Sequence, residues 1–453
     1  MNAVPTHFQT ARRSLSLLAL LGAACLLFTA APRANATVAW HHGFMEPYGG
    51  GIAGIEETWQ DAVTAEMGSD TMRITLSWDA YQTGVGEYNQ QALDNIVSRV
   101  QAARGWSPNP FNPKALITFE LPNEPIAWMQ SAGYEMTAGE GTHTARYYPA
   151  SIEGEKAYGK AMAKAFKYLY SVNIALAIET PNEPNLKNGP AWSIPAEYTG
   201  RLGAFGLVYA AAEGLPVLSA GGPAVLIGSV STNPDTEHSS EGKTPAQYFR
   251  LVQTSADYWI NWFYLGAPNE QSTAELLMGA WKASFHSYPE LGGGESKSCE
   301  KTLRGGQYKT QDESGNLTGA TADLTVRQRL TPVLEVLEEV PWKKKWWITE
   351  TGMTSYKTNV SETEVECNAR RVQGGSAYGK AEQKNFYADL AYNLDWQYIY
   401  GTYPWSAFEG VIFFKPLDGY ADPTDAYKGF GAFTPGCGNY CWKPAAEYFA
   451  NNL

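Results

Sequence analysis

The chain has little charge, and few cysteines and histidines for its length. Of its 453 residues 18% are charged, five are cysteine and six are histidine, and 46 Asp+Glu outnumber 34 Lys+Arg. The net charge of −12 argues against a nucleic-acid-binding protein, which needs a basic face for phosphates, and against adsorption to an anionic membrane. A hydrophobic content of 44% is too high for a disordered chain. We therefore expect a large globular protein, either an enzyme or a binding protein.

Long apolar runs are also scarce, and the one that is present stands near the N-terminus. Two arginines precede it, it extends over residues 14–31, and Ala34-Asn35-Ala36 follows with the small-x-small pattern of a signal-peptidase site. We expect residues 1–36 to be a cleaved secretory signal peptide, with an uncleaved N-terminal anchor as the alternative. No comparable run follows, so no membrane anchor is expected in the mature chain. That chain is expected to be secreted or periplasmic.

Four cysteines remain once the signal peptide is removed. An even number in an oxidising compartment suggests two disulfides, and four cysteines allow three pairings. We favour Cys437–Cys441, a tight loop, together with Cys299–Cys367. A zinc site is the competing interpretation, but zinc needs clustered ligands and the histidines are scattered along the chain.

Apolar strand candidates alternate with helical patterns, which is typical of βα units and a parallel sheet. The expected strands cover residues 38–43, 72–78, 115–121, 173–179, 216–220, 282–286, 346–350 and 410–415. The expected helices cover residues 91–104, 155–170, 195–213, 245–262, 324–339 and 381–396.

Eight strands with intervening helices predict an α/β fold of the (β/α)₈ TIM-barrel type, which usually needs ~250 residues and is longer with insertions. A doubly wound open sheet would show similar alternation, but no Gly-x-Gly-x-x-Gly follows the first strand, and eight strands favour closure. We expect residues 37–453 to form a single domain of this type. The extra length falls mostly in loops after strands, which line the catalytic face of a barrel, at residues 122–154, 221–244, 287–322, 351–380 and 416–441.

Two glutamates stand at or directly after apolar strands. Glu183 follows the fourth expected strand, and Glu350 ends the seventh. Partial desolvation at such a position raises the pKa of a carboxyl group toward the range of a general acid. Two acids that face each other across a barrel mouth suit glycosidic bond cleavage, because one protonates the leaving oxygen while the other attacks or activates water.

The tripeptide Pro-Asn-Glu alone is a weak signal, because it occurs three times in the chain. An asparagine that caps a helical turn, followed by a glutamate at its positive end, is a sufficient explanation for Asn269-Glu270. Glu124 follows the third expected strand and is better explained as a loop or subsite residue. The strand order therefore distinguishes Glu183 and Glu350 from the other copies.

The two strand ends together resemble the clan A (4/7) glycoside hydrolases, most closely family 39 and more loosely family 5. The resemblance is carried by Thr-Pro-Asn-Glu-Pro-Asn at 180–185 and Trp-Ile-Thr-Glu-Thr-Gly at 347–352. Supporting segments occur in the same order as in the family, at residues 72–78, 86–89, 195–198, 219–223, 285–288, 429–431 and 443–445.

This resemblance implies a retaining mechanism with Glu183 as acid/base and Glu350 as nucleophile. It further implies that Asn182 holds the sugar 2-hydroxyl and that Arg73 pairs with the nucleophile. By the same resemblance, Tyr288 hydrogen-bonds the nucleophile and His286 lies beside these residues. The resemblance implies no metal and no cofactor. An aromatic residue often precedes Asn-Glu in the family, whereas Thr180-Pro181 stands here, so the subfamily and the substrate are left open.

Elementary electrostatics supports the place of Arg73 independently. A buried arginine on a barrel strand is costly unless it meets a carboxylate, so an active-site acid is a natural partner, with a structural ion pair elsewhere in the barrel as the alternative. Tyr288 is also explained as a satisfied rim tyrosine, and His286 as a core histidine bonded to backbone.

Aromatic residues make up 13% of the chain, and several fall in expected loops, where flat rings can stack on sugars. Trp128 and Trp192 are the expected subsite residues, because each follows a strand end of the catalytic face. The scatter of loop aromatics favours an endo-acting enzyme with an open cleft, and the acidic charge balance favours a neutral glycan as substrate. The protein is expected to be a monomer. An exo-acting β-glycosidase such as a β-xylosidase, a transglycosylase, and a non-catalytic carbohydrate-binding barrel are the alternatives.

Overall fold

The computed structural model describes residues 40–45, 67–105, 112–139, 146–186, 193–232, 242–265, 271–289, 307–311, 317–352, 380–414, 433–435 and 440–452. The expected signal peptide lies outside these ranges. So do Cys299, Cys367 and Cys437, and only the backbone of Cys441 is described. The signal peptide and both disulfides stay predictions. A compact unit covers Val38–Asn451.

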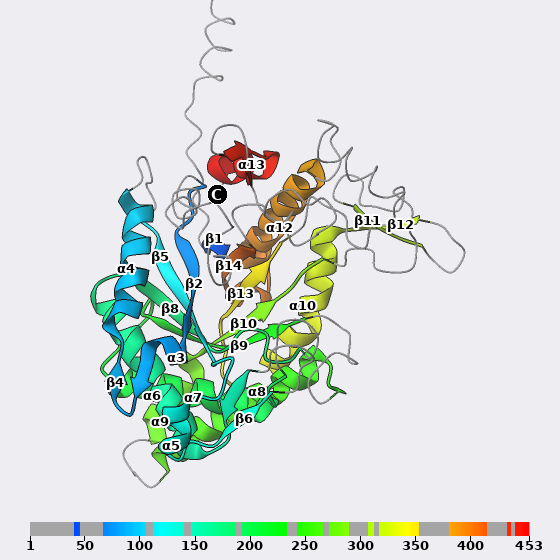
Figure 1. The fold of residues 1–453 in the computed structure, drawn as a ribbon. Helices are drawn as coiled ribbons and strands as arrows, with labels where there is room; N and C mark the ends of the chain where they lie inside the picture. The colour runs from blue at the N-terminus through cyan, green and yellow to red at the C-terminus, as the bar shows by residue number, and fades with distance from the viewer. Residues whose placement is uncertain are drawn as a thin grey trace, which may run out of the picture. The chain divides into compact units, whose positions relative to one another are not determined.

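Eight parallel strands close into a barrel (Figure 1). In chain order they are β1 His41–Met45, β2 Thr71–Ser77, β5 Lys114–Glu120, β8 Ala175–Glu179, β9 Ala224–Ser231, β10 Lys282–His286, β13 Trp346–Thr351 and β14 Phe408–Phe414. The first strand pairs with both the second and the last, which leaves the sheet without an edge. With helices around it, this sheet confirms the expected (β/α)₈ fold.

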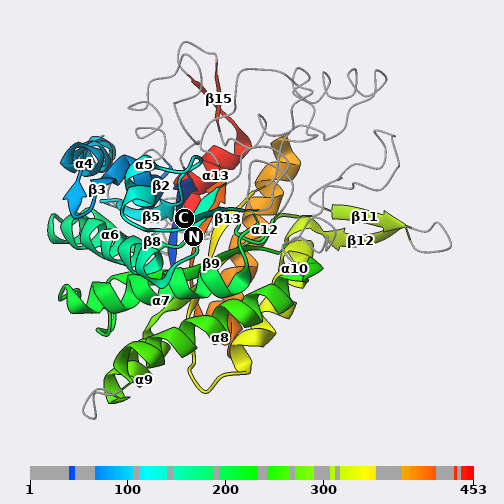
Figure 2. The ribbon, with the colours of Figure 1, turned by 60° about the horizontal axis from the view of Figure 1, so that its bottom comes forward.

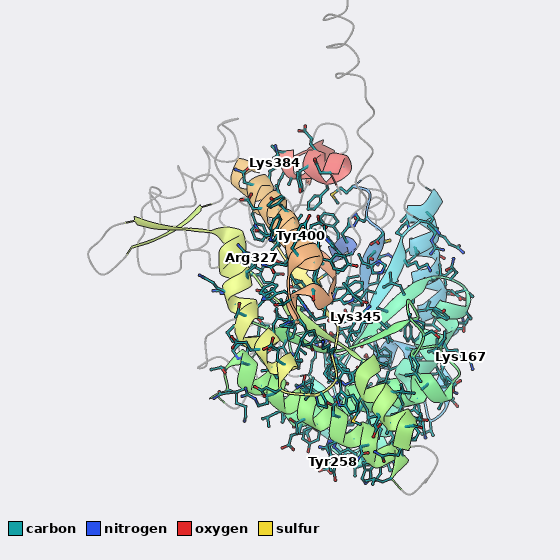
Figure 3. The ribbon with its side chains drawn as sticks, turned by 180° about the vertical axis from the view of Figure 1, so that it is seen from behind. Lys167, Tyr258, Arg327, Lys345, Lys384 and Tyr400 are labelled. Carbon is teal, nitrogen blue, oxygen red and sulfur yellow. The ribbon has the colours of Figure 1, made fainter. Side chains whose placement is uncertain are left out.

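Six long helices follow the strands: α4 Gln90–Gly105, α6 Ile152–Ser171, α7 Ala196–Ala212, α8 Pro245–Tyr264, α10 Ala322–Glu338 and α12 Lys380–Tyr400. All six expected helices are therefore present. Figure 2 shows α6, α7 and α8 side by side along the outside of the barrel, and α10 and α12, seen from behind in Figure 3, continue this row beyond α8. None of the described helices is both long and apolar enough to cross a membrane.

The start of α8 illustrates why a helix begins where it does. The Thr244 hydroxyl accepts a hydrogen bond from the Gln247 backbone N–H at 3.2 Å, and the Gln247 side chain accepts one from the Thr244 N–H at 2.9 Å. Pro245 occupies the first helical position, where no N–H is needed. This capping box satisfies donors that a helix start otherwise leaves free.

Shorter elements lie in the loops. The helices are α3 Trp78–Tyr81, α5 Ala127–Ser131, α9 Gln271–Ala280, η3 Trp405–Ala407 and α13 Pro444–Asn452. Four two-stranded sheets pair β3 Gln82–Gly84 with β4 Glu87–Tyr88, β6 Met136–Ala138 with β7 Tyr147–Pro149, β11 Gln307–Gln311 with β12 Leu317–Thr321, and β15 Phe433–Pro435 with β16 Tyr440–Trp442. All four follow the C-terminal ends of barrel strands, as expected for long βα loops.

The expected fifth strand, residues 216–220, is wrong. These residues form turns, and the strand is β9, which begins at Ala224. Pro216 has no N–H for a sheet, and Gly221 adopts a positive φ of 72° that strands do not use. All eight residues of β9 are buried, as is usual for a strand covered on both faces. The expected insertion at 221–244 therefore contains this strand.

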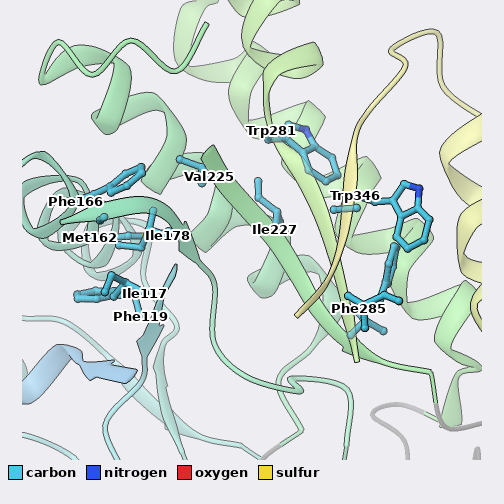
Figure 4. Close-up of a cluster of buried hydrophobic side chains, with 14 of the residues drawn as sticks. Ile117, Phe119, Met162, Phe166, Ile178, Val225, Ile227, Trp281, Phe285 and Trp346 are labelled. Atoms are coloured by element: carbon cyan, nitrogen blue, oxygen red, sulfur yellow. The ribbon is translucent and has the colours of Figure 1, made fainter. Parts of the chain in front are cut away.

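Two hydrophobic clusters occupy the two faces of the sheet. The larger lies between the strands and the helices, and Figure 4 shows part of it, including Ile117, Phe166, Ile227 and Trp281, which are all fully buried. Because side chains alternate along a strand, the smaller cluster faces the barrel interior. Its buried members are Met45, Leu116, Ala177, Ala224, Leu226, Trp347 and Ile412.

Candidate active site

The barrel interior changes from apolar to polar toward the C-terminal ends of the strands. Two residues beyond Leu116 and Ala177, the same interior rows carry Thr118 and Glu179, which lie side by side in the sheet. These polar interior positions are all buried: Arg73, Thr118, Glu120, Glu179, Ser284, His286 and Thr349. The apolar cluster fills the barrel interior below these side chains, so they face the C-terminal end of the barrel.

Arg73 of β2 lies at the centre of this group and is 1% exposed. Its Nη1 donates to Glu350 Oε2 at 2.9 Å, and its Nη2 donates to Asn182 Oδ1 at 2.7 Å. Its Nε and Nη2 both donate to Glu179 Oε2, at 3.1 and 2.8 Å. The sequence left two alternatives for this arginine, a bond to an active-site acid or a structural ion pair elsewhere in the barrel. In the structure it contacts both the expected nucleophile Glu350 and a buried second carboxylate, Glu179.

Glu350 lies in β13, and each of its carboxylate oxygens has its own donor. Oε2 accepts from Arg73, while Oε1 accepts from the hydroxyl of Tyr288. Burial and then the charge of Glu350 raise the pKa of Tyr288 well above its ordinary value, so this hydroxyl stays protonated and donates. The carboxylate is therefore oriented from two sides and is almost closed off from solvent, with 8% of its side chain exposed.

Glu183 lies in the turn after β8 and is the more open of the two acids, with 19% of its side chain exposed. Its φ of +42° is in the left-handed region, which is uncommon for a residue other than glycine and often marks a functional position. The backbone N–H of Glu183 donates to the carbonyl of Ser229 in β9 at 3.0 Å. This bond ties the turn to the neighbouring strand.

His286 of β10 lies between the two acids. Its Nδ1 is 3.2 Å from Glu183 Oε1 and 3.6 Å from Glu350 Oε2. Its Nε2 is 3.3 Å from Arg73 Nη2, and because a guanidinium can only donate, Nε2 accepts and Nδ1 carries the proton. The imidazole thus presents an N–H to the carboxylates.

The side chains of Glu183, His286 and Glu350 approach one another closely. One oxygen or nitrogen atom from each lies within 4.8 Å of the others, which is the only such group of possible metal ligands among the described residues. A metal ion would need the lone pair of Nδ1, whereas the bond from Arg73 places a proton there. The arrangement therefore fits a pair of acids with an imidazole N–H between them better than a metal centre.

A buried ion pair that the sequence did not reveal holds the backbone of Asn182. Glu120, at the end of β5, accepts from the Asn182 N–H at 2.7 Å and pairs with Arg146. Arg146 in turn donates to the Asn182 carbonyl at 3.3 Å. Burial raises the pKa of Glu120, although Arg146, the Asn182 N–H and Arg73 act in the opposite direction. Glu120 ends an apolar strand just as Glu350 does, so the same signal predicts it; nothing marks Arg146.

Glu179 is the second group that the sequence analysis missed. It is fully buried, and it accepts from Thr349 Oγ1 at 2.5 Å and Thr118 Oγ1 at 3.2 Å. Burial by itself raises the pKa of Glu179, but Arg73, His286 and neighbouring hydroxyls outweigh it, so that its pKa is lowered. An acid at the end of the apolar run 175–178 was the available signal. Glu179 lies four residues before Glu183, and the carboxylate of this strand end was assigned to Glu183 instead.

The structure describes one of the two expected subsite tryptophans. Trp128 lies on α5, half-buried, with its ring edge-on to Trp78 at 6.5 Å and to Tyr134 at 6.1 Å between centroids. Trp192 lies outside the described residues. Their role in binding sugar stays a prediction. Glu124 is exposed in the loop after β5.

Comparison with known proteins gives similar folds only. No family model matches the chain, and no curated protein matches its sequence. A family 39 glycoside hydrolase from the gut symbiont Bacteroides cellulosilyticus is 16% identical with a TM-score of 0.48, over 87% of this chain and 60% of that one. An endo-beta-1,4-glucanase from Xanthomonas axonopodis is 12% identical with a TM-score of 0.49, over 91% and 97%. A beta-glucosidase from Exiguobacterium marinum is 12% identical with a TM-score of 0.45, over 86% and 85%.

The chain spans about three fifths of the length of the family 39 enzyme. At such identities the likeness concerns the fold. The class that fold and site define is a (β/α)₈ barrel with two carboxylates at the ends of its fourth and seventh strands, and its activity is argued from those residues.

Proposed function

We propose that this protein is a secreted, retaining glycoside hydrolase that cleaves β-glycosidic bonds by double displacement. The observation that carries the proposal is the close approach of Glu183 and Glu350, which have carboxylate oxygens within 4.8 Å of each other. Retaining enzymes keep their two carboxyl groups about 5–5.5 Å apart, whereas inverting enzymes separate them by about 6.5–9.5 Å to admit a water molecule. The approach here suits direct attack by a carboxylate on the sugar.

The surroundings of the two acids assign their roles. The guanidinium of Arg73 lies 2.9 Å from Glu350 and holds its carboxylate in place, as attack by a nucleophile requires. Among the described residues, Glu183 pairs only with His286, and it is the more exposed acid. Glu183 is therefore free to exchange a proton with solvent and with the leaving group.

The reaction takes place in two displacements. Glu350 attacks the anomeric carbon while the bond to the glycosidic oxygen breaks, and that oxygen takes the proton of Glu183. A water molecule then attacks the same carbon, gives its proton to Glu183, and releases Glu350. Because Asn182 Oδ1 accepts from Arg73, the Asn182 amide NH₂ is the group that can donate to a sugar hydroxyl.

Endo action on a neutral polysaccharide or oligosaccharide is the finer part of the proposal. Support comes from the many aromatic residues of the expected loops and from the acidic net charge of −12, which disfavours an anionic polymer. Secretion is supported by the N-terminal apolar run and its small-x-small site. Exo action and transglycosylation are the competing outcomes within the same chemistry.

The proposal is tested on a panel of polysaccharides and aryl β-glycosides, with products analysed by mass and the first-formed anomer by NMR. We expect Glu183→Ala and Glu350→Ala each to lower kcat by at least about 10³-fold without loss of the fold. The matched control is Glu338→Ala, which alters an exposed glutamate at the end of α10 and is expected to keep full activity.

Full activity in either active-site variant would end the assignment. A first product of α configuration would show inversion instead of retention. Binding of a glycan without turnover by the unmodified protein would favour the non-catalytic carbohydrate-binding barrel.

A further inference from the structure

The guanidinium of Arg73 is divided unequally between two carboxylates. Its Nε–Nη2 edge is directed at Glu179, with both nitrogens donating to the same oxygen at 3.1 and 2.8 Å. Only Nη1 reaches Glu350, through a single bond of 2.9 Å to Oε2. An arginine facing one carboxylate commonly makes two parallel bonds to it. Here Nη2 gives its remaining N–H to Asn182 Oδ1 at 2.7 Å, so Glu350 keeps the single bond from Nη1.

Glu179 is built to hold a negative charge at this place. It is fully buried, and besides Arg73 it accepts hydrogen bonds from the hydroxyls of Thr118 and Thr349. Its pKa is lowered in spite of its burial, so the group is ionised over the working range of an enzyme. With no exposed surface it cannot touch a substrate, so any effect it has on the reaction acts through its neighbours, of which Arg73 donates a hydrogen bond directly to Glu350.

We propose that Glu179 is a positioning residue for the nucleophile: by holding the Nε–Nη2 edge of Arg73 and offsetting its charge, it fixes the guanidinium against Glu350 and limits the pull of that charge on the attacking carboxylate. This inference rests on the proposed function of Glu350. The two carboxylates have different tasks, since Glu179 neutralises the arginine and Glu350 reacts.

The charged groups around Glu350 show why this balance matters. Arg73 from β2 is the cation beside it, His286 and Tyr288 face it from β10 and the loop that follows, and Glu183 faces it from the turn after β8. Without the charge of Glu179, the full positive charge of Arg73 would act on Glu350. An opposite charge at ~4–6 Å stabilises an ionised carboxylate by about 1–3 pH units. Such a carboxylate is a weaker base and a weaker nucleophile.

The test is the isosteric substitution Glu179→Gln. The new amide oxygen can still accept from Arg73, and its NH₂ can donate to the Thr349 hydroxyl, so the volume and most bonds are kept. We expect the titration midpoint of the Glu350 carboxyl, followed by ¹³C NMR and identified by its absence in Glu350→Gln, to fall by about one pH unit. The acidic limb of the kcat/KM profile moves down by the same amount, and kcat falls about tenfold with KM little changed.

The matched control is Glu155→Gln, the same substitution at another fully buried glutamate, which lies on α6 beside Arg201. We expect this variant to leave the Glu350 midpoint and the acidic limb in place. Glu179→Asp keeps the charge but shortens the side chain, so it should lower kcat without moving the limb.

A folded Glu179→Gln protein with an unchanged Glu350 midpoint overturns the inference. If that variant does not fold, Glu179→Asp decides, because a shift of one unit with the charge retained would contradict the role of that charge. The NMR midpoint needs no turnover. A wild-type protein that hydrolyses no glycoside but shows the expected shift would refute the proposed function and leave the coupling of the two carboxylates standing.

Discussion

Both ends of the barrel bury charged side chains, but they balance them differently. At the N-terminal end, Lys344 precedes β13 and is fully buried. Its Nζ lies 3.1 Å from Asp257 Oδ1, donates to the Met278 carbonyl, and lies 4.0 Å from the centre of the Trp281 ring. Among the residues that the structure describes, this cation thus pairs with one acid. At the C-terminal end a single guanidinium serves two carboxylates, with a third acid close by.

A second group of charges at the N-terminal end, one glutamate with two lysines, is also compensated. Glu409 of β14 is met by Lys282 from β10 and by Lys345, an exposed lysine labelled in Figure 3. Two cations there lower the pKa of Glu409 even though burial opposes them. The two lysines therefore keep the carboxylate of Glu409 ionised and paired.

The two sites differ in which sign of charge is in excess, and not in burial alone. Lys344 and Arg73 are equally inaccessible, yet only the surroundings of Arg73 contain more carboxylates than cations. A surplus of acids costs stability, because like charges repel in a place that water does not screen. It also leaves carboxylates that can take up a proton or attack, which is what catalysis needs.

The largest effect is expected from removing the shared cation. In Arg73→Met, Glu179 is left buried without its partner and Glu350 loses one of its two donors. We expect kcat/KM to fall by at least about 10³-fold and the free energy of unfolding to fall by about 5 kcal/mol. Kinetics and chemical denaturation measure both quantities. Arg73→Lys, which keeps the charge but not the fork of donors, should lose less of each, and activity within tenfold of wild type in Arg73→Met would contradict the central place of this residue.

The corresponding change at the other end separates stability from activity. Lys344→Met leaves Asp257 with the Trp281 indole N–H as its partner among the described contacts. We expect a loss of about 4 kcal/mol in the free energy of unfolding, with kcat unchanged within about twofold. The double variant Lys344→Met/Asp257→Leu should recover part of that loss. A large fall in kcat with unaltered stability would show that the two ends are not independent.

A smaller effect is expected at a buried acid that belongs to neither end. Glu155 of α6 is fully buried, and Arg201 Nε lies 3.3 Å from its Oε1. Burial raises its pKa to about 7 from the ordinary 4.5, although Arg201 opposes the rise. Between these values the folded state holds a proton that the unfolded state has lost, so the fold loses stability as the pH rises from 4.5 to 7.

That loss amounts to about 3 kcal/mol when each pH unit is worth ~1.4 kcal/mol. Denaturation of the wild type and of Glu155→Gln at pH 4.5 and pH 7.5 measures it, because the glutamine variant lacks this contribution. Equal pH dependence in both proteins would show that the helix pair hydrates this carboxylate.

Much of the fold was predictable because it depends on short-range patterns. Seven of the eight strands and all six long helices were placed by apolar runs and periodicity, including β10 at its observed bounds Lys282–His286. The fifth strand failed because a short apolar run at 216–220 stands before a longer one in β9. A local sequence pattern does not show which of the two apolar runs is buried. The closed barrel has room for only one strand here, and that strand is β9, which is buried throughout.

The residues of the site also divide into those that a local pattern predicts and those that it does not. Glu183 and Glu350 were predicted because each stands at the end of an apolar strand, and strand order alone brings strand ends to one face. Glu120 and Glu179 carried a similar signal and were passed over, since nothing local distinguishes an acid that reacts from one that supports. Arg146, in a loop, carried none at all.

The amino-acid sequence by itself determined the barrel, the order of its strands and the two acids at the ends of the fourth and seventh, because alternation and apolar runs are encoded over a few residues. Only the tertiary structure decided which charges meet. Arg73 is separated from Glu179 by 106 residues and from Glu350 by 277, and their contacts depend on the register of eight strands around a closed barrel. The charge balance that distinguishes a reactive carboxylate from a structural one is a property of that closure, because each acid is tuned by neighbours that only the fold brings within a few ångströms.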